Sequence, residues 1–262
     1  MNTGQIALSV FTKPWKIPIP ELGQFVSRLG FDGVELPVRP GFQVEPQNVA
    51  RDLPKAARQL AELSLKIFSI AGPTDEATFA TCAELNIPII RTMVSIGEEG
   101  YLATVARVQK EYDALVPLLE KYGVTIGVQN HSDRFVCNAM GLRHLIEKYD
   151  PRHVAAVWDA AHNALNGEDP ELALDIVWSH LCMVNLKNAF PRRTTGPEAE
   201  YVQWRPYWTS GRQGLAQWPR VVAELKKRGY QGVVCLTAEY SDEGSVNRLI
   251  AEDLAFAKSL LA

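Results

Sequence analysis

The sequence contains little cysteine and no long apolar run. Its four cysteines (Cys82, Cys137, Cys182 and Cys235) are far apart and stand in apolar settings, which predicts reduced core residues rather than a disulfide or zinc framework. No apolar run approaches the roughly 20 residues of a membrane span, and the first residues, MNTGQIALSVF, lack the basic region and cleavage site of a signal peptide. We therefore expect a cytoplasmic protein that does not bind membranes.

The sequence also lacks an excess of charge of either sign. Its 27 basic and 30 acidic side chains give a formal net charge of −3 and are mixed along the chain. Nucleic-acid binding requires a basic stripe, so we do not expect nucleic acid as a partner. With 262 residues, 47% of them hydrophobic, the chain can bury a large core without disulfides or a structural metal.

What the sequence does contain is a regular alternation of short apolar runs and longer segments of helical period, without a linker between them. Eight runs are predicted to be strands: 5–11, 32–36, 66–71, 88–94, 124–130, 153–159, 181–187 and 232–239. Eight βα units in a chain of this length predict an α/β fold, a (β/α)8 TIM barrel forming a single domain over residues 1–262. A doubly wound open sheet is the alternative.

In such a barrel the chemistry stands at the carboxyl ends of the strands. Six of the predicted ends carry polar side chains, and this convergence predicts one functional mouth. These residues are Glu35, Arg91, Gln129 to His131, Asp159, Lys187 with Asn188, and Glu239.

The segment VAAVWDAAH, residues 154–162, changes abruptly from apolar to polar. We expect Asp159 to end a strand as a carboxylate facing the mouth and His162 to follow on the next loop, where the two could hold a metal and a hydroxyl. The alternative is that Asp159 caps the following helix and His162 packs at its start.

The connection over residues 188–211 is too long for an ordinary barrel loop and is rich in aromatic and basic residues. Aromatic faces stack on sugar rings and guanidinium groups bind hydroxyls or anions, so we expect a lid that contributes Arg192, Trp204 and Trp208 to a substrate site. The alternative is a surface excursion or a contact between copies in a homo-oligomer.

Five segments together resemble the xylose-isomerase-like TIM barrels, a family that includes sugar-phosphate isomerases and epimerases. They follow one another over nearly the whole chain: GFDGVEL, LEKYGVTIGVQNH, VAAVWDAAH, MVNLKNA and GYQGVVCLTAEY. The resemblance implies an enzyme that isomerises or epimerises a small sugar, sugar phosphate or sugar acid by proton transfer, with no organic cofactor.

The resemblance also implies a site for one divalent cation. In family members that act on ketoses, four side chains hold the cation, and their positions here look like Gln129, Asp159, Asn185 and Glu239. Gln129 stands where the family has a glutamate, and Asn185 where it has a histidine. The site thus loses a formal charge, which implies weakened binding of Mn²⁺ or Mg²⁺ and disfavours Zn²⁺.

The family's chemistry resembles proton transfer between two carboxylates, and Gln129 cannot abstract a proton. This implies Glu239 as the base, with His131, Glu35 or His162 as the second proton carrier. Lys187 is expected to bind substrate oxygens. The expected substrate-binding residues are Glu35, Arg91, His162, Asn188, Arg192, Trp204 and Trp208. Two alternative functions remain: a metal-free lyase or aldolase in which Lys187 forms an imine, and a barrel that binds a sugar without chemistry.

Overall fold

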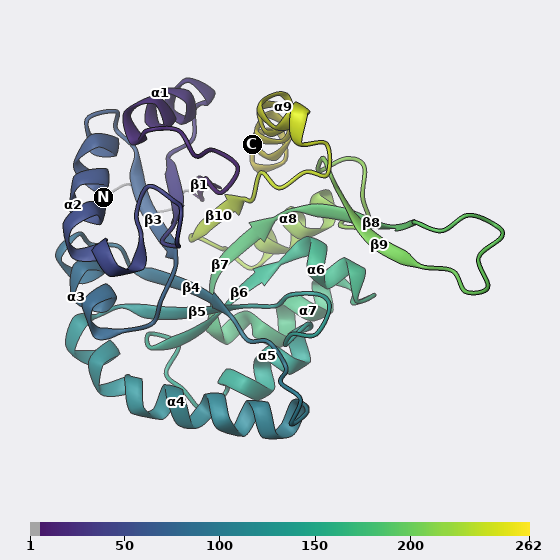
Figure 1. Cartoon of the computed structure of the whole chain (residues 1–262), viewed down its shortest axis with the longest axis horizontal. Helices are drawn as coiled ribbons and strands as arrows, with labels where there is room; N and C mark the ends of the chain where they lie inside the picture. The colour runs from purple at the N-terminus through teal and green to yellow at the C-terminus, as the bar shows by residue number, and fades with distance from the viewer. Residues whose placement is uncertain (1–5) are drawn as a thin grey trace.

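Parallel strands close into a barrel in the computed structural model, which describes residues 6–262 (Figure 1). Around the barrel their order is β1-β10-β7-β6-β5-β4-β3-β2. The strands are β1 (Ala7–Phe11), β2 (Gly33–Pro37), β3 (Lys66–Ala71), β4 (Ile89–Met93), β5 (Thr125–Gln129), β6 (Val154–Asp159), β7 (Leu181–Leu186) and β10 (Val233–Leu236). Each strand begins no more than two residues from its predicted start. Gln5, the first residue of the predicted strand 5–11, lies outside the described residues. The predicted single-domain barrel fold is confirmed.

Helices cover the outside of the barrel (Figure 1). In α4 (Tyr101–Tyr122) the apolar side chains Val105, Val108 and Leu119 are buried because their spacing places them on the face toward the strands. The helix ends where Gly123 adopts a left-handed φ of 64°. The helices are α1 (Ile19–Leu29), α2 (Val49–Ala61), α3 (Glu76–Glu84), α4 (Tyr101–Tyr122), α5 (Ala139–Ile146), α6 (Ala160–Leu165), α7 (Pro170–Val177), α8 (Trp218–Lys227) and α9 (Val246–Leu261), with short 3₁₀ turns η1 (Pro46–Asn48), η2 (Trp178–His180) and η3 (Glu243–Ser245).

Two apolar regions stabilise this arrangement. Successive strand residues point to opposite faces, so Val184 of β7 joins the large core between strands and helices while Met183 joins a smaller cluster. That smaller cluster also contains Phe11 and Val157, which alternate in the same way. The barrel interior is thus only partly apolar, and charged side chains occupy the layer nearest the carboxyl ends of the strands.

The connection after β7 forms an antiparallel hairpin, β8 (Asn188–Arg193) and β9 (Trp204–Thr209), which projects from the barrel (Figure 1). Its register pairs Ala189 with Trp208 near the barrel and Arg193 with Trp204 farther out. The two ends of the hairpin therefore have different surroundings.

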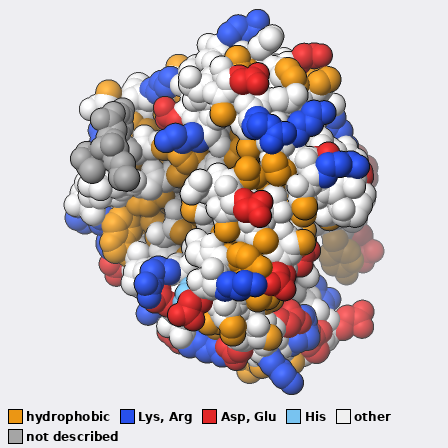
Figure 2. Space-filling model, turned by 90° about the vertical axis from the view of Figure 1, so that its left-hand side faces the viewer, with side chains coloured by type: hydrophobic (Ala, Val, Ile, Leu, Met, Phe, Trp, Pro, Cys, Tyr) orange, Lys and Arg blue, Asp and Glu red, His pale blue; other side chains and the backbone are white. Residues whose placement is uncertain are grey.

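The mixed surface charge and the unpaired cysteines agree with what the composition predicts. On the face shown in Figure 2, basic and acidic side chains are intermingled. All four cysteines are free; Cys82 and Cys235 are buried, and burial raises the pKa of the Cys82 thiol to about 12. Within residues 6–262, no helix has the length and apolar character needed to cross a membrane.

Candidate active site at the barrel mouth

Polar side chains from several strand ends meet in a small deep pocket of about 50 Å³ at the carboxyl ends of the strands. An outer cavity of about 610 Å³ adjoins it and shares Lys13 and Glu239 with it. A cavity of this size matches a small-molecule ligand. The predicted residues that line the deep pocket are Arg91, Gln129, His131, His162, Asn185 and Glu239.

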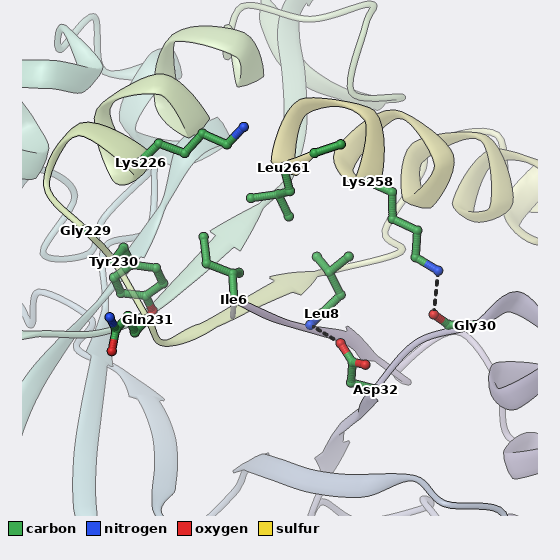
Figure 3. Close-up of a pocket in the computed structure, with 11 residues that line it drawn as sticks. Ile6, Leu8, Gly30, Asp32, Lys226, Gly229, Tyr230, Gln231, Lys258 and Leu261 are labelled. Atoms are coloured by element: carbon green, nitrogen blue, oxygen red, sulfur yellow. Dashed lines mark hydrogen bonds between the residues drawn. The ribbon is translucent and has the colours of Figure 1, made fainter. Parts of the chain in front are cut away.

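A cavity of about 620 Å³ lies at the opposite end of the barrel, beside the amino ends of β1 and β10 (Figure 3). Its polar groups serve the fold: Asp32 Oδ2 accepts a hydrogen bond from Leu8 N at 2.7 Å, and Lys258 Nζ donates to Gly30 O at 2.7 Å. The mouth, where titratable and unpartnered groups converge, is therefore the better candidate for chemistry.

A chain of buried hydrogen bonds crosses the floor of the mouth. Arg91 Nε donates to Glu35 Oε1 at 2.8 Å, and Arg91 Nη1 donates to Gln129 Oε1. Gln129 Nε2 in turn donates to Asp159 Oδ2 at 2.9 Å. Glu35 is fully buried and does not line the deep pocket, so its role in the structure is to hold Arg91.

Asp159 ends β6 and caps α6. Its Oδ1 accepts hydrogen bonds from the backbone N–H groups of Ala161 and His162 at 3.0 and 3.1 Å. The structure thus agrees with the alternative interpretation of VAAVWDAAH, and His162 belongs to a helix rather than to a loop. Burial raises the pKa of Asp159 to about 6, although the charge of Lys187 opposes the shift.

Glu239 is held between two ammonium groups. Lys187 Nζ donates to its Oε2 at 2.7 Å, and Lys13 Nζ donates to its Oε1. Burial by itself would raise the pKa of Glu239, but the charges of Lys187 and Lys13 outweigh it and hold the pKa well below its usual value. So acidic a carboxyl group is a weak base, which disfavours the predicted role of Glu239 in proton abstraction.

The hydrogen bonds of Ser132 assign opposite tautomers to the two histidines of the mouth. His162 Nδ1 accepts from Ser132 N at 3.0 Å, so in its neutral form the proton is on Nε2. His131 Nδ1 lies 2.8 Å from Ser132 O, which only accepts, so its proton is on Nδ1 and Nε2 carries a lone pair. The rings lie 4.0 Å apart between centroids.

Both histidines are held in the neutral form. Burial, followed by the charges of Lys187 and His131, lowers the pKa of His162 well below its usual value. Burial also lowers the pKa of His131, with a smaller contribution from Lys187. Protonating His162 would moreover place an Nδ1–H against the N–H of Ser132. The pair therefore combines one donor, His162 Nε2–H, with one acceptor, His131 Nε2.

Several buried polar atoms at the mouth have no hydrogen-bond partner among the described residues. A buried donor or acceptor without a partner costs about 1–3 kcal/mol, so such atoms indicate groups that a ligand or water satisfies. They are Glu35 Oε2, Arg91 Nη2, His162 Nε2, Thr237 Oγ1 and both amide atoms of Asn185.

The residues at the implied metal site do not fit a divalent cation. Both oxygens of Asp159, both of Glu239 and the Gln129 amide oxygen already accept hydrogen bonds from N–H groups. Lys187 brings positive charge to the same place. Within residues 6–262, no group of three or more His, Cys, Asp and Glu side chains is arranged to hold a metal. A cation here would have to displace several of these donors.

Besides the buried Glu35, three residues expected to bind substrate line neither the deep pocket nor the outer cavity. The Asn188 amide is buried and donates to the backbone of Gly211 and Ala216, so it fixes the base of the hairpin. Arg192 packs its guanidinium over Tyr207 on the exposed hairpin, and Trp204 is 58% exposed. Trp208 does reach the mouth: its ring lies 3.7 Å from Lys187 Nζ and meets His162 edge-on.

The structure adds Lys13, Arg39 and Thr237 to the mouth. They follow the ends of β1, β2 and β10, respectively. The expectation that chemistry stands at the carboxyl ends of barrel strands could therefore have identified them too. Ser132 does not stand at a strand end and carries no such signal; its backbone contacts both histidines, and its Oγ lies 2.9 Å from His162 Nδ1.

Comparison with known proteins identifies one family and several solved structures of similar fold. Residues 24–260 match the family described as Xylose isomerase-like TIM barrel. No curated protein matches by sequence. Among solved structures, D-psicose 3-epimerase of Clostridium cellulolyticum with D-tagatose is similar at a TM-score of 0.70 and 13% identity, covering 98% of this chain and 99% of that chain.

Two further structures are similar over their whole length. The 3-keto-D-glucoside 4-epimerase of E. coli has a TM-score of 0.72 and 13% identity, covering 97% of this chain and 100% of that chain. A probable 3-DHS dehydratase of Bacillus anthracis, involved in petrobactin synthesis, has a TM-score of 0.73 and 14% identity, covering 97% and 99%. At such identities the likeness concerns the fold.

Proposed function

The chain belongs to the xylose isomerase-like TIM barrel family, and from this premise we propose that it is a sugar or sugar-acid isomerase that moves a hydrogen between neighbouring carbons without a metal. Two structures of similar fold are by name epimerases of carbohydrates, which supports the class of substrate. The choice of isomerisation and the absence of metal from the mechanism rest on this chain's own residues.

The observation that carries the proposal is the pair of histidines with opposite tautomers. His131 Nε2 has a lone pair at neutral pH and lines the deep pocket, so it can take a proton from a carbon next to a carbonyl group. The electron pair of the broken C–H bond then moves to the carbonyl oxygen. His162 Nε2–H and the Lys187 ammonium are the donors that can stabilise the resulting enediolate oxygen.

A single base favours isomerisation over epimerisation. Inversion at carbon requires a second group that returns the proton from the opposite face, and Glu239 is held as a carboxylate of low basicity by Lys13 and Lys187. The imidazolium of His131 can instead return its proton to the neighbouring carbon on the same face. Within the enediolate the proton of the adjacent hydroxyl passes to the former carbonyl oxygen, while the Lys187 ammonium and His162 Nε2–H donate hydrogen bonds and keep their protons. Once the imidazolium has returned its proton to carbon, His131 is back in its starting state.

The imine chemistry that the sequence left open is disfavoured by the surroundings of Lys187. Its Nζ donates to Glu239 and lies over the ring of Trp208, and attack of this nitrogen on a carbonyl carbon would have to break both contacts.

The test is solvent hydrogen exchange. The protein is incubated in D2O with a panel of ketoses, aldoses and keto-acids of sugars, and deuterium at the carbon next to the carbonyl is followed by NMR together with interconversion. We expect exchange and isomerisation without added metal, and a loss of at least about 100-fold in His131→Gln, because a positioned general base contributes about 10²–10⁴-fold.

His144→Gln is the matched control, since His144 is exposed on α5 and should leave the rate unchanged. Full exchange in His131→Gln would refute the role of His131. A borohydride-trapped adduct at Lys187 would refute isomerisation in favour of imine chemistry.

A further inference from the structure

The deep pocket is lined by more cationic than anionic side chains, and we infer that the ligand of the mouth carries a carboxylate held by Arg39 and Arg91. The inference concerns the same mouth as the proposed function and rests on it for the rest of the ligand, a polyhydroxy compound.

The excess of positive charge follows from the ion pairs. Arg91 is paired with Glu35, whereas Lys187 and Lys13 share a single carboxylate, that of Glu239. Arg39 has no ion-pair partner among the described residues. Three cations, Lys13, Arg39 and Arg91, thus line the deep pocket, against one carboxylate, that of Glu239.

The unpaired guanidinium lies beside the deep pocket. Arg39 Cζ is 5.7 Å and Arg91 Cζ 4.6 Å from the centroid of the Phe11 ring, so the two guanidiniums share one aromatic neighbour. Burial and then the charge of Arg91 lower the pKa of Arg39. An anion bound between the two guanidiniums would relieve this repulsion, because unlike charges attract strongly where water is excluded.

Arg91 also has a free donor for such an anion. Its Nε and Nη1 are engaged by Glu35 and Gln129, whereas the buried Nη2 has no partner among the described residues. Guanidinium N–H groups match the planar geometry of a carboxylate. Together, Arg91 Nη2 and Arg39 provide the donors that one carboxylate group requires.

The size of the pocket favours a carboxylate over a phosphate. The deep pocket measures about 50 Å³, far less than the outer cavity of about 610 Å³. A planar carboxylate of three heavy atoms fits such a space better than a tetrahedral phosphate. The outer cavity of about 610 Å³ can accept the remaining hydroxylated carbons.

The test is calorimetric titration of the full chain with three ligands that share one carbon skeleton: D-glucuronate, D-glucose and D-glucose 6-phosphate. We expect saturable binding of D-glucuronate at least about tenfold tighter than that of the other two. Arg39→Gln should weaken D-glucuronate binding at least about tenfold and leave the weak binding of D-glucose unchanged. The matched control is Arg58→Gln, an exposed arginine in the last turn of α2, which should bind as the parent protein does.

Four results would overturn the inference: equal binding of D-glucose and D-glucuronate, tighter binding of D-glucose 6-phosphate, no effect of Arg39→Gln in a variant with native circular dichroism, or no binding of D-glucuronate. Because binding is measured without turnover, a failure of the carboxylate inference can be distinguished from a failure of the proposed function. Exchange on neutral ketoses without carboxylate binding refutes only the inference, and binding without exchange refutes only the isomerase.

Discussion

At the scale of single residues, Gln129 shows why an amide suits the floor of this mouth. Its oxygen accepts from the Arg91 guanidinium, and its nitrogen donates to the Asp159 carboxylate. A carboxylate could make the first bond but not the second, because it has no proton to donate at neutral pH. One of the two residues that depart from the implied metal-binding pattern therefore completes the buried hydrogen-bond chain.

We predict that Gln129→Glu destabilises the protein by roughly 1–3 kcal/mol, because a second carboxylate would replace the donor 2.9 Å from Asp159 Oδ2. Differential scanning calorimetry with and without Mn²⁺ should show a lowered Tm that Mn²⁺ does not restore. Gln24→Glu, at an exposed position of α1, is the control and should leave the Tm unchanged. A rise of several degrees with Mn²⁺ would show that the site accepts a metal.

At the scale of elements, strand β9 extends from the mouth into the exposed part of the hairpin (Figure 1). Trp208 lies over Lys187 Nζ at 3.7 Å, whereas Trp204, four residues earlier, is 58% exposed. The hairpin therefore contributes to the mouth through its base.

This difference predicts unequal effects of the same change at two tryptophans of one strand. Trp208→Leu removes a cation–π contact worth about 1–2 kcal/mol and should lower kcat/KM of the exchange reaction about tenfold. Trp204→Leu should change it less than about twofold. Steady-state kinetics on both variants compare the two positions directly, and equal losses would mean that the outer hairpin also contacts substrate.

The carboxyl group of Asp253 connects α9 to two loops near the mouth. Its Oδ1 accepts from Gly211 N at 2.8 Å, and its Oδ2 accepts from Tyr240 OH at 2.8 Å. Burial raises the pKa of Asp253 to about 6, although these hydrogen bonds oppose the shift. In the unfolded chain the pKa returns to about 3.9.

A raised pKa in the folded state means that Asp253 favours folding most below pH 4 and loses this contribution as the pH rises through 6. The shift corresponds to at most about 3 kcal/mol. Asp253→Asn can keep both contacts, with Oδ1 accepting from Gly211 and Nδ2 donating to the Tyr240 oxygen. Urea unfolding between pH 4 and 7 should show that the stability of the parent protein falls with pH relative to this variant. Parallel curves would contradict the raised pKa.

At the scale of the whole molecule, charge is distributed unevenly between the surface and the mouth. The chain has a formal net charge of −3, yet three cations and a single carboxylate line the deep pocket at the strand ends. Salt screens buried charges less than exposed ones, so the mouth can attract an anion although the molecule as a whole is weakly acidic.

The sequence by itself determined the barrel and the ring of polar residues at its mouth. Buried parallel strands require short apolar runs and the covering helices require a 3.6-residue period, and both are local patterns. Because the carboxyl ends of the strands in a barrel meet at one mouth, the positions of Arg91, Lys187 and Glu239 followed from the strand ends alone.

Only the tertiary structure decided which of these groups are partners and what each can do. Lys13 and Glu239, which form an ion pair, are 226 residues apart in the sequence, and Arg91 and Glu35 are 56 apart. Whether Glu239 abstracts a proton or only forms ion pairs with Lys13 and Lys187 depends on such contacts. The tautomers of His131 and His162 likewise depend on the backbone of Ser132, 30 residues from His162. The charge of an acidic or basic side chain and the position of a histidine proton depend on the groups that surround them in space, and the sequence pattern does not show which distant residues come into contact.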